Sequence, residues 1–404
     1  MYGLVLEGGG AKGAYQAGAI KALLDNGYEF DLITGTSIGA INGAFVVQGD
    51  FNEIYDLWKE ADITKLINTD IKVLDELLKL NINEKNLSKI LKYLIKTVKA
   101  GGLDITPLKE LLIEKIDEEK IRNSNTEFGL VTVSLSEFEP LELFIENIEE
   151  GKLIDYILAS ANLPIFKNDK LDGKILIDGG FYNNRPVNMV INKGIKDIIV
   201  IETQGIGRRP KINEDGLNII KIKASEKISK SIEVEPKIMK KSLKVGYLDA
   251  LRQINDLYGD TYYIKLEFSE KKIIEKIIDL SSKQLDRLKK LFNYQQGIYL
   301  TDIFEEILPF VSKLLEIDKP YSYLDLLISF NEYIAEINNL DNLKVYSYDE
   351  IIKLNYKSIK DKEMKFNDKY KYISNKVIFK SVDLMPKKIV DKFLIKLYKI
   401  IYKK

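Results

Sequence analysis

One serine in the sequence has a setting that could make it a nucleophile. Ser37 is the centre of Gly35-Thr-Ser-Ile-Gly39, which follows the apolar run 31–34 and precedes the helical pattern 38–47. A serine on such a strand-to-helix turn exposes its hydroxyl at the edge of a sheet, because the flanking glycines relieve the crowding. The alternative is an ordinary turn with a capping serine, so the pattern alone predicts a candidate and not a mechanism.

Histidine and cysteine are both absent from the 404 residues. Their absence excludes Ser-His-Asp triads, Cys-His dyads, imidazole and thiolate metal sites, and disulfides. A serine hydroxyl is a poor nucleophile without a base. A hydrolase built from this sequence must therefore take its base from carboxylates, lysines or tyrosines.

An aspartate lies where such a base could be placed. Asp178-Gly-Gly180 ends the apolar run 174–177. Open α/β sheets bind ligands beyond the carboxyl ends of their strands, which is where this aspartate would lie. The alternative is a simple turn aspartate, which is common.

A glycine loop, Gly8-Gly-Gly-Ala-Lys-Gly13, follows the apolar strand 2–6 and opens a helix. Its N–H groups can face one point, where they would bind a phosphate or a developing oxyanion. The loop also matches the dinucleotide pattern G-x-G-x-x-G. That function expects an acidic residue at the end of the second strand, where this chain has the Ser37 turn, so a nucleotide-binding module is the weaker alternative.

The three motifs together resemble the patatin-like phospholipase family, whose pattern is a glycine loop ending in Arg or Lys and Gly, a G-x-S-x-G turn, and a D-G-G or D-G-A turn. Two further segments are similar to family features, namely Ala159-Ser-Ala-Asn-Leu-Pro164 and Phe181-Tyr-Asn-Asn-Arg-Pro186. The resemblance covers residues 1–205 and is expected to extend to Leu266.

The resemblance implies a dyad of Ser37 and Asp178 without histidine, and the composition independently requires a mechanism of that kind. The expected oxyanion hole is formed by backbone N–H groups of Gly8, Gly9, Gly10 and Ile38. The residues expected to support the motifs are Lys12, Gly13, Gly35, Gly39, Gly179 and Gly180. Asn183 and Asn184 are expected to fix the loop after the aspartate.

The expected chemistry is proton transfer from Ser37 to Asp178, attack on an ester carbonyl and an acyl-enzyme intermediate. Free aspartate has a pKa of about 3.9, and a desolvated site would raise it toward a useful value. Lys12 has two interpretations: a positive charge that supports the anionic loop, or a structural ion pair on the first helical turn.

The predicted function is that of a lipid acyl hydrolase, either a phospholipase A-type enzyme or a lysophospholipase. Alternatives are a triacylglycerol lipase or thioesterase of the same fold, a nucleotide-binding module, or a non-catalytic scaffold. No metal and no cofactor are expected. Because Lys+Arg and Asp+Glu balance at 61 each, no nucleic-acid partner is expected either.

The expected fold is a three-layer α/β/α arrangement with a mostly parallel central sheet, followed by a mainly helical C-terminal region. The expected catalytic domain is 1–268, and 269–404 is the region of unknown role. A last strand is expected near 262–266. The helical segment 60–103 is expected either to cover the site or to pack on the sheet.

The tail 386–404 has seven lysines and one acid, with apolar residues at helical spacing on another face. Such a basic amphipathic helix is a candidate peripheral membrane contact. The alternative is a terminal helix that packs its apolar face on the protein core. The sequence shows no signal peptide and no transmembrane segment, so a cytoplasmic protein is expected, either soluble or peripheral to a membrane.

Overall fold

A computed structural model describes residues 1–62, 104–137, 139–163, 166, 170–229, 234–317, 321–360 and 386–402. The chain divides into two compact units, 1–255 and 256–404, and each is described by itself. The division lies N-terminal to the boundary expected near 269. Most of the segment 60–103, expected to cover the site or pack on the sheet, lies outside the described residues.

The N-terminal unit is built on an eight-stranded sheet. Its strands are β1 (Tyr2–Leu6), β2 (Leu32–Thr36), β3 (Glu127–Ser134), β4 (Glu139–Phe144), β5 (Lys170–Leu171), β6 (Lys174–Asp178), β7 (Asp197–Glu202) and β8 (Asn218–Lys223). The order is β5-β6-β3-β2-β1-β7-β8, and β4 pairs with β3. The central run from β3 to β8 is parallel, whereas β4 and β6 are antiparallel to β3.

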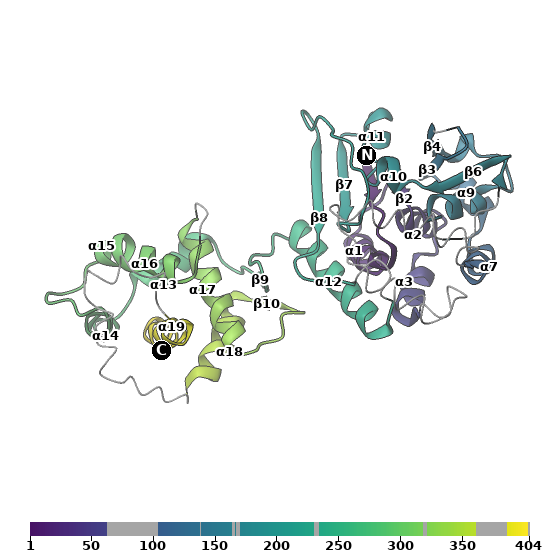
Figure 1. Ribbon diagram of the computed structural model, residues 1–404. Helices are drawn as coiled ribbons and strands as arrows, with labels where there is room; N and C mark the ends of the chain where they lie inside the picture. Colours follow the sequence, from purple (N-terminus) through teal and green to yellow (C-terminus); the bar gives the residue numbers. More distant parts are fainter. Residues whose placement is uncertain are drawn as a thin grey trace. The chain divides into compact units, whose positions relative to one another are not determined.

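Helices cover both faces of this sheet (Figure 1). They are α1 (Gly13–Asp25), α2 (Ile38–Val47), α3 (Phe51–Glu60), α7 (Thr106–Lys115), α8 (Glu118–Arg122), α9 (Leu153–Ser160), α10 (Gly180–Asn183), α11 (Val187–Asn192) and α12 (Pro236–Ile254), with short 3₁₀ turns η1 (Gly10–Lys12) and η3 (Ile145–Asn147). On β1, Val5 packs with Val190 of α11, whereas the next residue, Leu6, meets Gly39 of α2. Because neighbouring strand residues point to opposite faces, α11 and α2 lie on opposite sides, which confirms the α/β/α layering.

Helices α1 and α12 pack through glycines. A Cβ on Gly18 would lie 1.9 Å from the carbonyl oxygen of Leu243, and one on Gly246 would lie 1.9 Å from that of Tyr15. The two backbones therefore touch where neither helix carries a side chain. This contact fixes α1, the helix that follows the glycine loop.

The C-terminal unit is mainly helical, as expected. Its elements are β9 (Tyr263–Lys265), α13 (Glu270–Ile278), α14 (Ser282–Phe292), α15 (Leu300–Asp302), the π-helical turn η4 (Ile303–Ile307), α16 (Leu308–Leu314), α17 (Tyr323–Ile337), β10 (Val345–Ser347), α18 (Tyr348–Lys360) and α19 (Lys387–Ile401). The strand expected near 262–266 exists as β9. It pairs in parallel with β10, and so it belongs to this unit and not to the large sheet.

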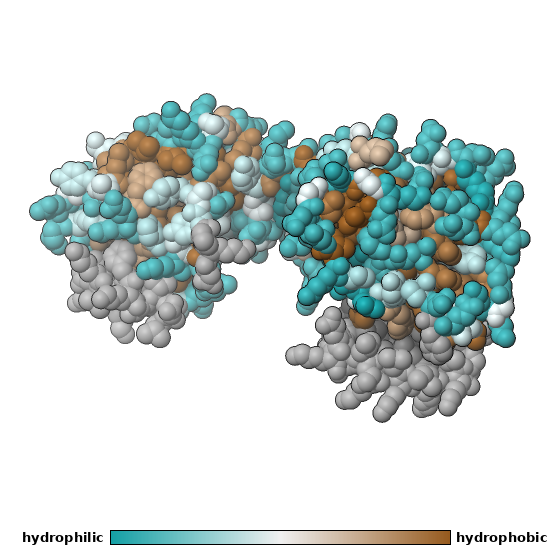
Figure 2. Space-filling model, turned by 90° about the horizontal axis from the view of Figure 1, so that it is seen from above, coloured by the Kyte–Doolittle hydropathy of each residue, from teal (hydrophilic) through white to brown (hydrophobic). Residues whose placement is uncertain are grey.

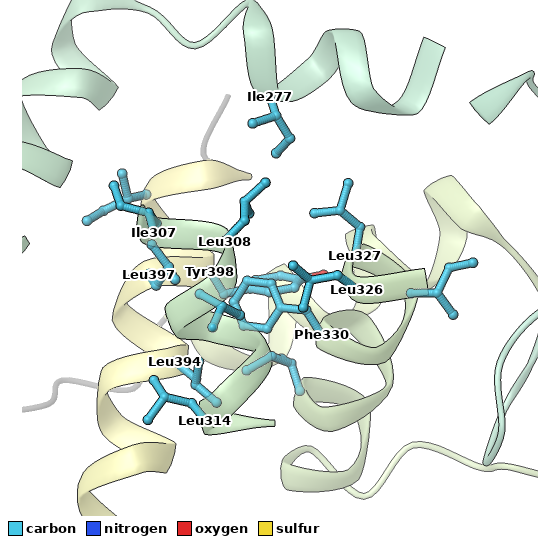
Figure 3. Close-up of a cluster of buried hydrophobic side chains, with 14 of the residues drawn as sticks. Ile277, Ile307, Leu308, Leu314, Leu326, Leu327, Phe330, Leu394, Leu397 and Tyr398 are labelled. Atoms are coloured by element: carbon cyan, nitrogen blue, oxygen red, sulfur yellow. The ribbon is translucent and has the colours of Figure 1, made fainter. Parts of the chain in front are cut away.

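The C-terminal helix α19 forms part of the core of its unit. Phe393, Leu394, Leu397 and Tyr398 are buried there, and Figure 3 shows Leu394 and Leu397 beside Leu314, Ile307 and Leu308 of neighbouring helices. The tail therefore follows the alternative given above, a terminal helix that packs its apolar face on the protein core. Its apolar face is occupied by the protein interior and is not available to a lipid surface in this conformation.

The described helices include none with the length and apolarity needed to cross a bilayer. Figure 2 shows one face of the molecule, on which hydrophobic side chains appear on both units among hydrophilic ones.

Candidate active site

The turn between β2 and α2 places Ser37 in a backbone conformation that side-chain-bearing residues rarely adopt. Ser37 has φ 56° and ψ −125°, and it is the residue immediately before the first turn of α2. A non-glycine residue with positive φ is strained, and such strain persists only where the surroundings enforce it. This is the local geometry expected of a nucleophile at a strand-to-helix turn.

The glycines that flank Ser37 are required by close backbone contacts. A Cβ on Gly35 would lie 2.4 Å from the carbonyl carbon of Gly39, and one on Gly39 would lie 2.2 Å from the carbonyl oxygen of Leu6. Any side chain at either position would push α2 away from the sheet. The G-x-S-x-G pattern thus follows from the tightness of the turn.

Asp178 ends β6 and reaches the same place. Its side chain is buried, and the N–H of Gly180 donates to its Oδ1 at 2.7 Å. Burial raises the pKa of this carboxyl to about 6, against the opposing effect of hydrogen bonds from the Ser37 hydroxyl and the Gly180 N–H. The Ser37 hydroxyl thus lies close enough to the Asp178 carboxyl to oppose the rise of its pKa, and the carboxyl is shifted in the direction that a general base requires.

The glycine loop lies beside Ser37, since a Cβ on Gly8 would lie 3.2 Å from Cβ of Ser37. The N–H of Gly8 donates to the carbonyl oxygen of Asn184 at 3.0 Å, so it is already paired. Gly9 precedes η1, Gly10 begins it, and Ile38 begins α2. The first N–H groups of a helix have no acceptor within the helix. The expected oxyanion set is accordingly reduced to Gly9, Gly10 and Ile38, and Gly8 is removed from it.

The remaining glycines of the motifs also lie at tight contacts. A Cβ on Gly13 would lie 2.4 Å from Cγ1 of Ile38, one on Gly179 would lie 2.1 Å from the carbonyl oxygen of Val131, and one on Gly180 would lie 3.0 Å from Oδ1 of Asp178. These positions need glycine because other parts of the site occupy the space.

Of the two interpretations of Lys12, the structural ion pair is not seen among the described residues, and support of the anionic loop by its charge stays a prediction. The Nζ of Lys12 donates to the carbonyl oxygen of Gln204 at 2.8 Å. Burial lowers the pKa of Lys12, although the nearby Glu7 carboxylate opposes that shift. Among the salt bridges between described residues, none involves Lys12. Lys12 therefore fixes a neighbouring loop.

The neighbouring loop, residues 203–209, is held beside the glycine loop by hydrogen bonds and an ion pair to a buried acid. Glu7 is fully buried, and it pairs with Arg209 and accepts the N–H of Gln204 at 2.9 Å. Burial raises the pKa of Glu7, and Arg209 opposes that shift. Because Lys12 binds the carbonyl of Gln204 and Glu7 binds its N–H, both polar backbone groups of this residue, which has φ 52°, are held.

Asn183 and Asn184 tie the aspartate turn to its neighbours, as expected. Asn183 donates to Glu142 and Asn188, and its carbonyl accepts the hydroxyl of Thr36 at 2.8 Å. Asn184 donates through Nδ2 to the carbonyl of Gly8 at 3.2 Å. The three motifs are thus one hydrogen-bonded assembly.

The sequence analysis missed Glu7, Arg209 and Thr203 of this assembly, and it noted the segment of Ser160 only as a family feature, without a role. The Thr203 hydroxyl donates to the carbonyl of Gly8 at 2.7 Å. An acid at the end of an otherwise apolar strand, at Glu7, was a usable signal, since a buried charge needs a partner. That partner, Arg209, is 202 residues away, and nothing in the sequence identifies it.

Within the described ranges, no group of three or more acidic side chains is arranged so that it could hold a metal ion.

Residues 4–191 match the family model described as patatin-like phospholipase. These residues, a little under half of the chain, are similar to a patatin-like phospholipase domain. The matched region contains the glycine loop, Ser37 and Asp178.

Curated relatives match up to half of the chain. Patatin-like phospholipase domain-containing protein 7 of Rattus norvegicus is 29% identical over 206 residues, which is 49% of this chain and 13% of the rat protein. Neuropathy target esterase sws of Drosophila melanogaster is 27% identical over 209 residues, again 13% of its length. Lysophospholipase nte1 of Aspergillus terreus is 64% identical over 42 residues, 10% of this chain and 3% of that protein. The chain thus spans only a small part of these relatives.

Among solved structures, VipD from Legionella pneumophila aligns with a TM-score of 0.41 and 16% identity, over 99% of this chain and 90% of that one.

Proposed function

We propose that this chain hydrolyses carboxylic esters of lipids through Ser37 and Asp178. The observation that carries the proposal is the contact between a strained serine and a buried carboxyl whose pKa is raised to about 6. A serine needs a base within reach, and a base works best when its pKa is near the working pH. The family of residues 4–191, whose members include phospholipases and esterases by name, supports lipid esters as the substrate class.

In the proposed first half-reaction, Asp178 takes the proton of the Ser37 hydroxyl while Oγ attacks the carbonyl carbon. The N–H groups of Gly9, Gly10 and Ile38 stabilise the oxyanion. The intermediate collapses when the C–O bond to the alcohol breaks, and Asp178 returns its proton to that alcohol. The products are a free alcohol and an acyl ester of Ser37.

In the second half-reaction, water replaces the alcohol. Asp178 takes a proton from the water, which attacks the acyl carbonyl. The bond to Ser37 Oγ then breaks, and the proton returns to Oγ, which releases the fatty acid and restores the starting state. Each half-reaction uses the same base and the same oxyanion site.

The test is fatty-acid release from a panel of substrates by the full chain and by Ser37→Ala. The panel contains a diacyl phospholipid, a lysophospholipid, a triacylglycerol, an acyl thioester and a short soluble ester. We expect release from a phospholipid or lysophospholipid that Ser37→Ala abolishes. Preference for the triacylglycerol or thioester would select an alternative within the same chemistry. Release that persists in Ser37→Ala would refute the proposal, and nucleotide binding without any hydrolysis would favour the module alternative.

A further inference from the structure

Ser160, the last residue of α9, lies against the turn that carries Ser37. Its side chain is fully buried. Its hydroxyl accepts the backbone N–H of Ser37 at 2.9 Å and donates to the carbonyl oxygen of Val131 at 2.6 Å. The hydroxyl thus uses its hydrogen and one lone pair at once, and it connects β3 to the turn between β2 and α2.

The N–H of Ser37 depends on this partner. Ser37 has left the ladder of β2 and precedes the first helical residue, so neither element supplies an acceptor for it. An unpaired buried N–H costs about 1–3 kcal/mol. The contact also fixes the one residue whose positive φ must be enforced from outside.

The same residue contacts the other reacting group through its main chain. The carbonyl of Ser160 accepts the N–H of Gly179 at 3.3 Å, and the carbonyl of Asn162 accepts the N–H of Asp178 at 2.8 Å. The turn after α9 therefore sets the backbone position of Asp178, while the Ser160 side chain sets that of Ser37.

We propose that Ser160 is a positioning residue that fixes the distance between the Ser37 hydroxyl and the Asp178 carboxylate. This inference rests on the proposed function. The Ser160 hydroxyl is committed to two backbone groups, so it acts through Ser37 and not on the substrate. Without it, the turn loses the bond that opposes relaxation of Ser37, and the nucleophile moves relative to its base.

The test compares Ser160→Ala with Ser134→Ala. Ser134 is also a fully buried serine of the N-terminal unit, and its hydroxyl accepts a backbone N–H, that of Glu137, at 3.2 Å. Both changes delete one buried hydroxyl, but only one of these hydroxyls contacts Ser37. Ser160→Ala should lose more thermal stability than Ser134→Ala, because the Ser160 hydroxyl makes two hydrogen bonds and that of Ser134 accepts one.

On a short soluble ester, we expect Ser160→Ala to lower kcat by about 10- to 100-fold with KM nearly unchanged, because small misplacement of reacting groups costs rates of this order. Ser134→Ala should keep the wild-type kcat. Equal kcat in the two variants would overturn the inference. If Ser37→Ala is as active as the wild type, the proposed function fails instead. A crystal structure of Ser160→Ala gives a readout that needs no activity: we expect Ser37 to leave its contact with Asp178, and an unmoved Ser37 would also overturn the inference.

Discussion

Glycine and tyrosine are divided unequally between the two units. Of the 25 glycines, only Gly259 and Gly297 fall in 256–404, whereas 15 of the 23 tyrosines do. In the N-terminal unit, segments meet backbone to backbone, as at Gly39 and Leu6. In the C-terminal unit, side chains fill the interior, and the Tyr398 hydroxyl donates to Oδ1 of Asn331 at 2.5 Å.

This difference shows two ways of using a buried contact. A backbone contact excludes even one methyl group, so it sets the position of the atoms beyond it within narrow limits. A core of large side chains tolerates exchanges that conserve volume, and it stabilises a unit without fixing particular reacting atoms. The close backbone contacts of the N-terminal unit can fix the positions of reacting atoms. The side-chain core of the C-terminal unit stabilises a packed group of helices.

The largest effect should come from the reacting pair in the N-terminal unit. We expect Ser37→Ala and Asp178→Asn each to lower kcat on a soluble ester by about 10³-fold or more, because the nucleophile or its base is removed. The double variant should be no slower than the slower single variant, since the two residues act as one unit. Near wild-type turnover in either single variant would contradict the assignment, and circular dichroism should show an unchanged fold.

The next effect belongs to the C-terminal unit, where α19 packs into the core. Leu394 is fully buried, so Leu394→Ala should cost about 2–5 kcal/mol of stability through a cavity. Lys388→Ala, at an exposed position of the same helix, should change little. Thermal or denaturant unfolding measures both.

A Leu394→Ala variant with wild-type stability and weakened binding to anionic vesicles would reverse the assignment of α19. It would show that the apolar face of α19 meets lipid and not the core. The C-terminal unit could then no longer be described as a core filled by the side chains of α19.

The chemistry of the site was predictable from sequence because its motifs are local. The turn glycines and Ser37 are adjacent in the chain, strand β1 has the bounds 2–6 that its apolar run predicted, and the apolar run 174–177 lies within β6. The meeting of Ser37 with Asp178 was expected only through the family pattern and the missing histidine.

Other features of the fold and the site could not be predicted, because they depend on contacts that no local sequence pattern encodes. The face of α19 is equally suited to a core and to a membrane interface, because both present an apolar surface. Strand β8 was not anticipated, since Asn218–Lys223 alternates lysines with isoleucines at the edge of the sheet. The pairing of Ser160 with Ser37 spans 123 residues, so only the folded chain brings them together.

A smaller effect on stability should distinguish glycines in close backbone contact from glycines with free space around them. Gly18→Ala would place a Cβ 1.9 Å from the Leu243 carbonyl oxygen, so α1 and α12 must separate, at about 1–3 kcal/mol. Gly297→Ala meets nothing within 4 Å, and it should be neutral or stabilise by about 0.4–1 kcal/mol by restricting the unfolded chain. Equal midpoints of thermal unfolding in the two variants would remove the distinction between the two kinds of glycine position.

The smallest expected effect is the pH dependence of the reaction, and it tests the electrostatics of the N-terminal site directly. The pKa of Asp178 is raised to about 6 by burial. Since the proposed base must be ionised, kcat/KM on a soluble, uncharged ester should rise as the pH increases through 6 and level off above it. Between pH 5 and pH 7 the ionised fraction of such a group rises roughly tenfold.

The sign of this profile is decisive, because a protonated Asp178 cannot accept the proton of Ser37. A rate that falls between pH 5 and pH 7 would mean that the active form is the carboxylic acid, and a flat profile would mean that Asp178 does not titrate in the reaction. Labelling of Ser37 by a neutral fluorophosphonate should follow the same curve, because it requires the same activated hydroxyl and no lipid. Agreement of the two curves would assign the midpoint to the pair of Ser37 and Asp178 and not to substrate binding.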